Sequence, residues 1–150
     1  MKINLLLSLL FLSSITFSQK NDDQIFWKYA KESFPRLIEL LAIPNDAHFP
    51  KEIEKNVRWC ETEFTNRGFK TTRLETPTVP LLLAEKQTSN PNAKTVLIYL
   101  QVDGQPVDPN HWFQENPYKA TLKKQAEEGG WETIDIELLK GENIDPDWRI

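Results

Sequence analysis

The first stretch of apolar residues with helical spacing lies at residues 24–41. Ile25, Tyr29, Leu37 and Leu41 give part of a helical repeat. Proline lacks an amide hydrogen and clashes with the preceding turn, so Pro35 must either kink this helix or begin a new one after Ser33. The residues 43–46 that follow, Ile-Pro-Asn-Asp, predict its end.

A second helix is predicted more strongly just downstream. Its apolar residues fall at i, i+4, i+7 and i+11, which places them on one helix face: Ile53, Val57, Cys60 and Phe64. Pro50 fits near the first turn, and Gly68 fits a left-handed cap at the end.

The hydrophobic pattern then changes to that of strands. Residues 69–74 and 81–84 read as short strands, and 89–92 (Ser-Asn-Pro-Asn) as a turn. Residues 95–100 (Thr-Val-Leu-Ile-Tyr-Leu) are the best strand, and their apolar character on both faces predicts a central, covered strand. Residues 131–139 alternate like a half-buried strand. Helices that precede such strands favour an α/β fold: two N-terminal helices, then a mixed sheet.

The N-terminus has the pattern of a secretory signal peptide. Lys2 is followed by an apolar run at residues 5–12, and small side chains at Thr16 and Ser18 predict cleavage after Ser18. The run is shorter than the roughly 20 residues that span a bilayer. An uncleaved anchor or a buried apolar helix are the alternatives. We expect a leader at 1–18, one domain at 19–150, and a secreted or periplasmic protein.

Composition narrows the classes of function further. The 150 residues carry a net charge of −4 and no basic stripe, which argues against nucleic acid as a partner. No stretch after the leader is apolar enough to cross a membrane. The single cysteine, Cys60, cannot form an internal disulfide, and its apolar surroundings favour a buried packing role over a nucleophile.

The stretch with candidate chemistry follows the strand at 95–100. Ligands of open α/β sheets bind beyond the carboxyl ends of the strands. Gln101 and Asp103 are two residues apart, so both side chains can point to the same side. Gly104 allows a sharp turn, and Pro106 and Pro109 stiffen the loop. On residue types alone, Asp-Gly after a strand is more often a plain turn.

The order of these motifs resembles the N-terminal part of the M20 metallopeptidases, which include dipeptidases, carboxypeptidases and aminoacylases. Residues 40–45 (LLAIPN) match the family's "LLxIPS" helix end. Residues 101–112 match its "HxDxQPVDPxxW" loop, except that Gln101 replaces the histidine. The resemblance also includes further short stretches: 63–64, 68–69, 95–99 and 116–118.

The resemblance implies a three-layer α/β sandwich of the zinc-exopeptidase type and a two-zinc site for amide hydrolysis. In the family the histidine of H-x-D binds one metal, and the aspartate orients that histidine. Gln101 would hold the metal-ligand position and Asp103 the orienting position. Substrates would be peptides or N-acyl amino acids. Full-length family members are often homodimers.

Two departures from the family pattern limit this expectation. The amide oxygen of Gln101 is a weak ligand for zinc, which favours imidazole, thiolate and carboxylate. The family's bridging aspartate, glutamate pair and distal histidine would all come after Ile150. We therefore expect the partial, truncated domain to be inactive by itself. The alternatives are a non-catalytic relative that binds peptides or amino acids, and an unrelated small secreted domain.

Three other groups are weaker candidates. His48 and His111 could substitute as metal ligands, although surface histidines are the more frequent explanation. Glu127 and Glu128 resemble the family's glutamate pair but lie at the wrong place in the order. They are expected to end a charged helix at Gly129 and Gly130.

Overall fold

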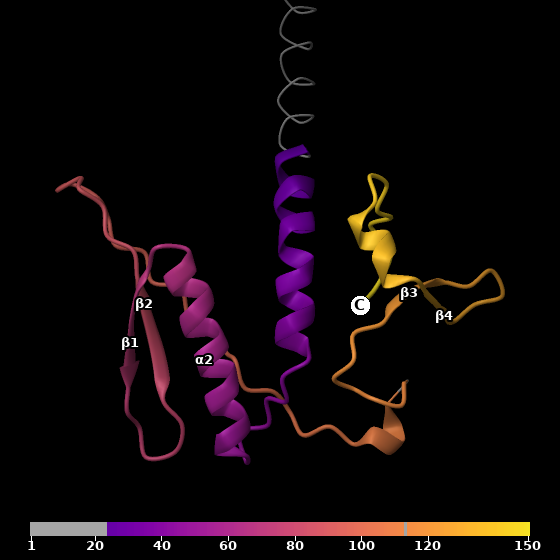
Figure 1. Ribbon diagram of the computed structural model, residues 1–150, viewed down its shortest axis with the longest axis horizontal. Helices are drawn as coiled ribbons and strands as arrows, with labels where there is room; N and C mark the ends of the chain where they lie inside the picture. The colour runs from indigo at the N-terminus through magenta and orange to yellow at the C-terminus, as the bar shows by residue number, and fades with distance from the viewer. Residues whose placement is uncertain (1–23, 113) are drawn as a thin grey trace, which may run out of the picture. The chain divides into compact units, whose positions relative to one another are not determined.

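The computed structural model describes residues 24–112 and 114–150, and Figure 1 shows its elements. The described chain divides into two compact units: residues 39–120 form one, and residues 24–38 together with 121–150 form the other. The predicted signal peptide lies outside the described residues. Among the residues that are described, no helix is long and apolar enough to cross a membrane.

The first helix is continuous over residues 24–41. Pro35 lies inside it, so the alternative in which a new helix begins after Ser33 is wrong. Ser33 Oγ donates a hydrogen bond to the carbonyl of Tyr29 at 2.7 Å, one turn back. The helix ends before the 43–46 stretch, as the sequence predicts.

Helix α2 (Pro50–Asn66) confirms the second predicted helix, with Pro50 in its first turn. Ile53 and Val57 are buried on the predicted face, whereas Cys60 and Phe64 are half-buried. Gly68 ends the helix with φ of +78°. The amides of Gly68 and Phe69 donate to the carbonyls of Thr65 and Phe64 at 2.9 and 3.0 Å, which is a Schellman motif.

The predicted strands at 69–74 and 81–84 are confirmed as β1 (Lys70–Leu74) and β2 (Leu81–Glu85). They pair antiparallel as a hairpin, with Thr72 opposite Leu83. Helix α2 contacts both strands, so the hairpin and the helix bury Ile53 and Val57 together. This helix and hairpin form the best-packed part of residues 39–120.

The sequence missed one strand of the other unit and misread the next element. Strand β3 (Leu122–Gln125) pairs antiparallel with β4 (Trp131–Ile134). The predicted strand over 131–139 is wrong beyond Ile134, because a short 3₁₀ helix, η2 (Ile136–Lys140), follows. Asp135 starts η2 by accepting a hydrogen bond from the amide of Glu137 at 2.9 Å. Leu122 and Leu139 are the buried residues here.

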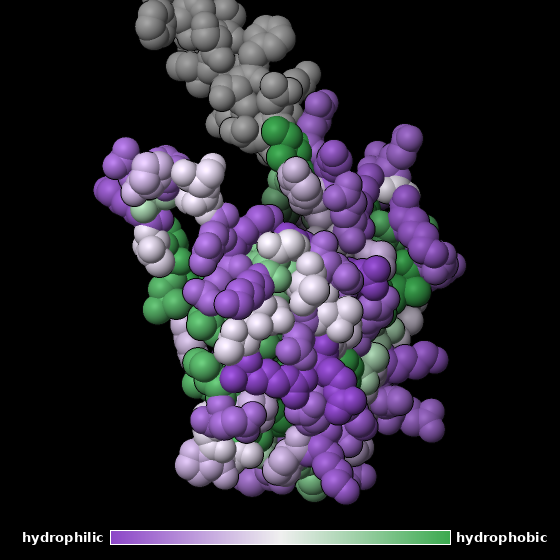
Figure 2. Space-filling model, turned by 60° about the vertical axis from the view of Figure 1, so that its left-hand side comes forward, coloured by the Kyte–Doolittle hydropathy of each residue, from purple (hydrophilic) through white to green (hydrophobic). Residues whose placement is uncertain are grey.

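The strongest predicted strand, residues 95–100, is not a strand among the described residues. Its apolar side chains are exposed, from 69% at Leu100 to 85% at Leu97. A segment that is apolar on both faces forms a strand only with neighbours on both edges and both faces, and the described residues provide none. The predicted mixed sheet is therefore also wrong: the described strands form two separate antiparallel pairs. The α/β character of the chain is confirmed. Exposed apolar side chains stand out among polar ones on the surface (Figure 2).

Candidate functional site

The structure brings the two main motif stretches of the sequence side by side within residues 39–120. Asp46 forms a parallel bridge with Gly104. The amide of Gly104 donates to the carbonyl of Asn45 at 2.9 Å. The side-chain amide of Asn45 donates to the carbonyl of Val102 at 3.2 Å. The loop after the first helix therefore holds the backbone that carries Gln101 and Asp103.

Gln101 and Asp103 are both exposed to solvent, whereas Val102 and Gly104, which alternate with them, are half-buried. This alternation is that of an extended backbone with one inner side and one outer side. An amide and a carboxylate on the outer side can bind the amide, amine or carboxylate groups of a peptide.

Gly104 is required for a different reason from the predicted one. The φ of Gly104 is not in the left-handed region, so residues other than glycine could adopt the same backbone conformation. A Cβ at this position would lie 2.7 Å from Oδ1 of Asn45 and 2.9 Å from its Nδ2. Gly104 therefore allows the close approach of the two loops rather than a sharp turn.

Both histidines are paired with a nearby carboxylate. His48 Nδ1 lies 2.7 Å from Asp46 Oδ1, which also accepts the backbone amide of His48 at 2.9 Å. That backbone hydrogen bond, followed by the ring of His48, lowers the pKa of Asp46. His111 Nδ1 lies 2.9 Å from Asp108 Oδ2. His111 belongs to a 3₁₀ turn, η1 (Pro109–His111), which Asp108 caps.

The donor groups do not fit zinc. Over residues 24–112 and 114–150, no three His, Cys, Asp or Glu side chains come together where they could hold a metal ion. Gln101 offers a neutral amide oxygen, and the two histidines are directed at Asp46 and Asp108. No chemical step through a metal is therefore derived for this chain.

Two other sequence candidates are placed away from any reactive arrangement. Glu127 and Glu128 lie in the turn between β3 and β4, so the expected helix end is wrong. The turn closes where the amide of Ala126 donates to the carbonyl of Gly130 at 3.1 Å. Cys60 is half-buried, and its burial, together with the Glu63 carboxylate, raises the pKa of the thiol. A thiol with a raised pKa is a poor nucleophile at neutral pH.

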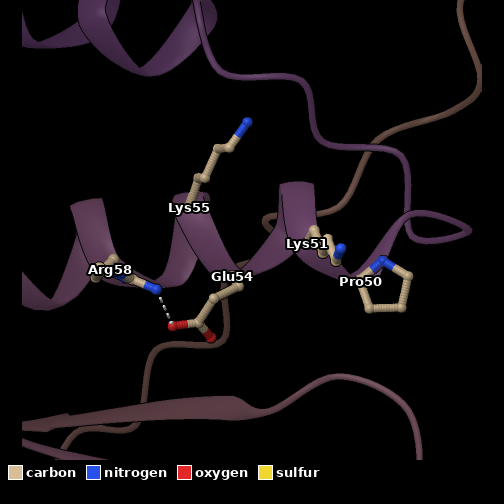
Figure 3. A pocket seen from close by; sticks show the side chains of 5 residues that line it. All are labelled: Pro50, Lys51, Glu54, Lys55 and Arg58. Atoms are coloured by element: carbon tan, nitrogen blue, oxygen red, sulfur yellow. Dashed lines mark hydrogen bonds and ion pairs between the residues drawn. The ribbon is translucent and has the colours of Figure 1, made fainter.

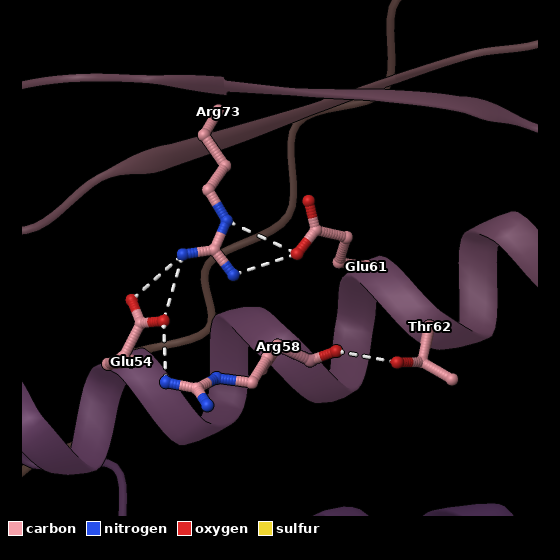
Figure 4. Close-up of polar contacts among 5 residues, drawn as sticks. All are labelled: Glu54, Arg58, Glu61, Thr62 and Arg73. Carbon is pink, nitrogen blue, oxygen red and sulfur yellow. Dashed lines mark hydrogen bonds and ion pairs between the residues drawn. The ribbon is translucent and has the colours of Figure 1, made fainter.

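A shallow depression lies on α2, lined by Pro50, Lys51, Glu54, Lys55 and Arg58 (Figure 3). It contains no nucleophile and neither Gln101 nor Asp103. Its one acidic group, Glu54, already accepts hydrogen bonds from Arg58 and Arg73. Arg73 on β1 reaches α2 and binds both Glu54 and Glu61 (Figure 4). These charges join the helix to the hairpin and have a structural role.

The sequence pattern missed two asparagines that build the site. Asn45 was read only as part of a helix end and of a family motif. Asn56 is a polar residue beside Val57 on the apolar face of α2, and this mismatch in the pattern is the signal that could have found it. It is 1% exposed and donates to the carbonyls of Pro44 at 2.7 Å and Glu52 at 3.0 Å.

Comparisons with protein-family models, curated proteins and solved structures gave no match to this chain.

Proposed function

We propose that this chain carries the N-terminal part of the catalytic domain of an exported M20-type peptidase or amidohydrolase. The observation that carries the proposal is the contact between the two motif stretches. LLAIPN and QVDGQPVDP are separated by more than 50 residues of sequence, yet Asn45 and Asp46 pair directly with Val102 and Gly104. A common ligand site requires such a juxtaposition, whereas two chance similarities do not.

The same proposal assigns the finer fold and the setting. Helix α2 and its hairpin would belong to a three-layer α/β sandwich of the zinc-exopeptidase type. Full-length proteins of this kind would be secreted or periplasmic, often homodimeric, and would act on peptides or N-acyl amino acids with two zinc ions. Because the described residues of this chain do not fit zinc, the chain by itself would bind such substrates without hydrolysing them.

A second candidate function is a non-catalytic peptide-binding or amino-acid-binding relative. Gln101 favours it, because an amide at the position of the family histidine keeps hydrogen-bonding capacity and loses metal affinity. In the first candidate Asp103 would orient the side chain of Gln101, and in the second both side chains would contact the ligand.

Titration of the isotope-labelled chain with a dipeptide, followed by NMR, tests the proposal. We expect shifts concentrated at residues 44–48 and 101–109, and binding about tenfold weaker in Asp103→Asn, because one charged hydrogen bond is lost. Asp147→Asn, at an exposed loop residue of the other unit, is the matched control. Shifts elsewhere or no shifts would contradict the proposal.

An activity assay tests the second half of the proposal. The purified chain should not cleave dipeptides or N-acyl amino acids, with or without added zinc. Hydrolysis that requires zinc and is abolished by a chelator would show that the chain builds a working site by itself.

A further inference from the structure

We infer that Asn45 and Asn56 are positioning residues: together they form an amide clamp that turns Gln101 and Asp103 outward. This inference rests on the proposed function, because it explains how the ligand-facing pair is presented. The clamp links α2 to residues 102–104 through the loop at 44–46 and contains no group that would react.

The clamp begins at a buried amide. Among the residues that the structure describes, Asn56 is the buried polar side chain, and its Nδ2 donates to the carbonyl of Pro44 at 2.7 Å. A buried amide without a partner is costly, so this bond fixes where Pro44 lies relative to α2. The hydrogen bond thereby anchors the loop at residues 44–46 to helix α2.

The next step is from this loop to the candidate site. Asn45 contacts residues 102–104 in three ways: its Nδ2 donates to the carbonyl of Val102, its carbonyl accepts the amide of Gly104, and its side chain occupies the space beside Gly104. Two hydrogen bonds and a steric contact fix both the register and the distance of this backbone.

The consequence for the site follows from the geometry of an extended chain. A Cβ at Gly104 would face the Asn45 side chain, and successive side chains of an extended chain point to opposite sides, so Gln101 and Asp103 lie on the side away from Asn45. Their observed exposure has this alternation. If the clamp is released, the backbone can rotate, and the two groups no longer face one ligand together.

Amide hydrogen exchange of the full chain, measured by NMR, tests the clamp directly. Asn45→Ala should lower the protection of the Gly104 amide by about fivefold, the effect of one lost hydrogen bond. Asn92→Ala, at an exposed asparagine in the 89–92 turn, is the matched control and should change nothing at Gly104. Equal protection in Asn45→Ala and the unaltered chain would overturn the inference.

Two further variants distinguish positioning from general destabilisation. Gly104→Ala should disturb residues 101–104 in the unaltered chain, because the new Cβ meets the Asn45 side chain, but much less in an Asn45→Ala background. Asn56→Ala should lower Gly104 protection without touching that residue, whereas Asn66→Ala, at the exposed end of α2, should not. Additive effects of Gly104→Ala and Asn45→Ala would contradict the steric contact.

The dipeptide titration separates this inference from the proposed function. If Asn45→Ala lowers Gly104 protection and also weakens dipeptide binding, both stand. If the protection falls but the unaltered chain binds no dipeptide, the clamp stands and the proposed function fails. If the dipeptide binds equally to the unaltered chain and to Asn45→Ala, the clamp does not position the ligand-facing pair.

Discussion

Helix α2 and the segment 95–100 both carry large apolar side chains, but Ile53 and Val57 of α2 are buried, whereas those of the segment are exposed. Ile53 on α2 is 3% exposed, whereas Ile98 is 73% exposed. Helix α2 contacts β1 and β2, which follow it directly along the chain. No described strand pairs with residues 95–100.

The difference shows that an apolar sequence indicates which residues would gain from burial. It does not indicate whether other elements are present to bury them. Helix α2 needs cover on one face only, and a neighbouring hairpin supplies it. A strand that is apolar on both faces needs two flanking strands and two covering layers. The hairpin next to α2 in the chain covers the first element, whereas no described strand pairs with the second.

The largest expected effect is on stability, and it comes from replacing an isoleucine by alanine in each of the two regions. Ile53→Ala should lower the free energy of unfolding by about 3 kcal/mol, because it removes buried methyl groups and leaves a cavity. Ile98→Ala should change it by less than about 0.5 kcal/mol, because the side chain is already in water. Urea denaturation monitored by circular dichroism measures both.

The contrast between the two regions would be contradicted if Ile98→Ala lowered the free energy of unfolding as much as Ile53→Ala. That result would mean that residues 95–100 are buried in solution. Sedimentation velocity on the same samples would then show whether self-association of this uncharged segment provides the cover.

The parts of the fold that the sequence predicted share this local origin. The helical spacing of Ile53 and Val57 and the cap at Gly68 are properties of one element, so the pattern alone gave α2 and its end. The failures concern pairing between elements. Strand β3 is polar in sequence (Leu-Lys-Lys-Gln) and is a strand because it pairs with β4, and Asp135 replaces the end of a predicted strand with a 3₁₀ turn.

The candidate site divides in the same way. The two-residue spacing of Gln101 and Asp103 predicts that both side chains lie on one side, and both residues are exposed. The role of Asn45 could not be predicted, because it depends on a contact with Val102 across 57 positions of sequence. The role expected for Gly104, a sharp turn, was wrong for the same reason. Glycine is needed here because a Cβ would collide with the side chain of Asn45, which is distant in sequence, and local turn preferences carry no information on such a contact.

A smaller effect tests the local cap of α2. Gly68→Ala should cost about 1 kcal/mol, because alanine is strained at a φ of +78° while no atom blocks its Cβ. Gly68→Asn should cost less, because asparagine tolerates the left-handed region. Thermal unfolding of the three proteins measures the difference. A larger loss for asparagine than for alanine would show that side-chain volume, and not backbone strain, decides at this position.

The smallest effect concerns the charges that join α2 to the hairpin. The hydrogen bond from Arg73, more than that from Arg58, lowers the pKa of Glu54 in the folded chain. A carboxylate whose pKa is lower when folded stabilises the fold fully above its unfolded pKa, about 4.3 for glutamate. That stabilisation is lost as the pH falls through the folded pKa. Arg73→Gln should therefore lower the melting temperature slightly at pH 7 and flatten its decline below pH 4.5.

Arg58→Gln is the matched control for this prediction, because Arg58 also binds Glu54 but is 70% exposed at its side chain and lies one turn away on the same helix. Its melting temperature should follow that of the unaltered chain more closely at every pH. If the two variants have the same pH profile, the link between the helix and the hairpin adds nothing beyond the helix's own ion pairs. In that case burial of Ile53 and Val57 alone holds the hairpin on α2, and the contrast with residues 95–100 becomes one of apolar contact only.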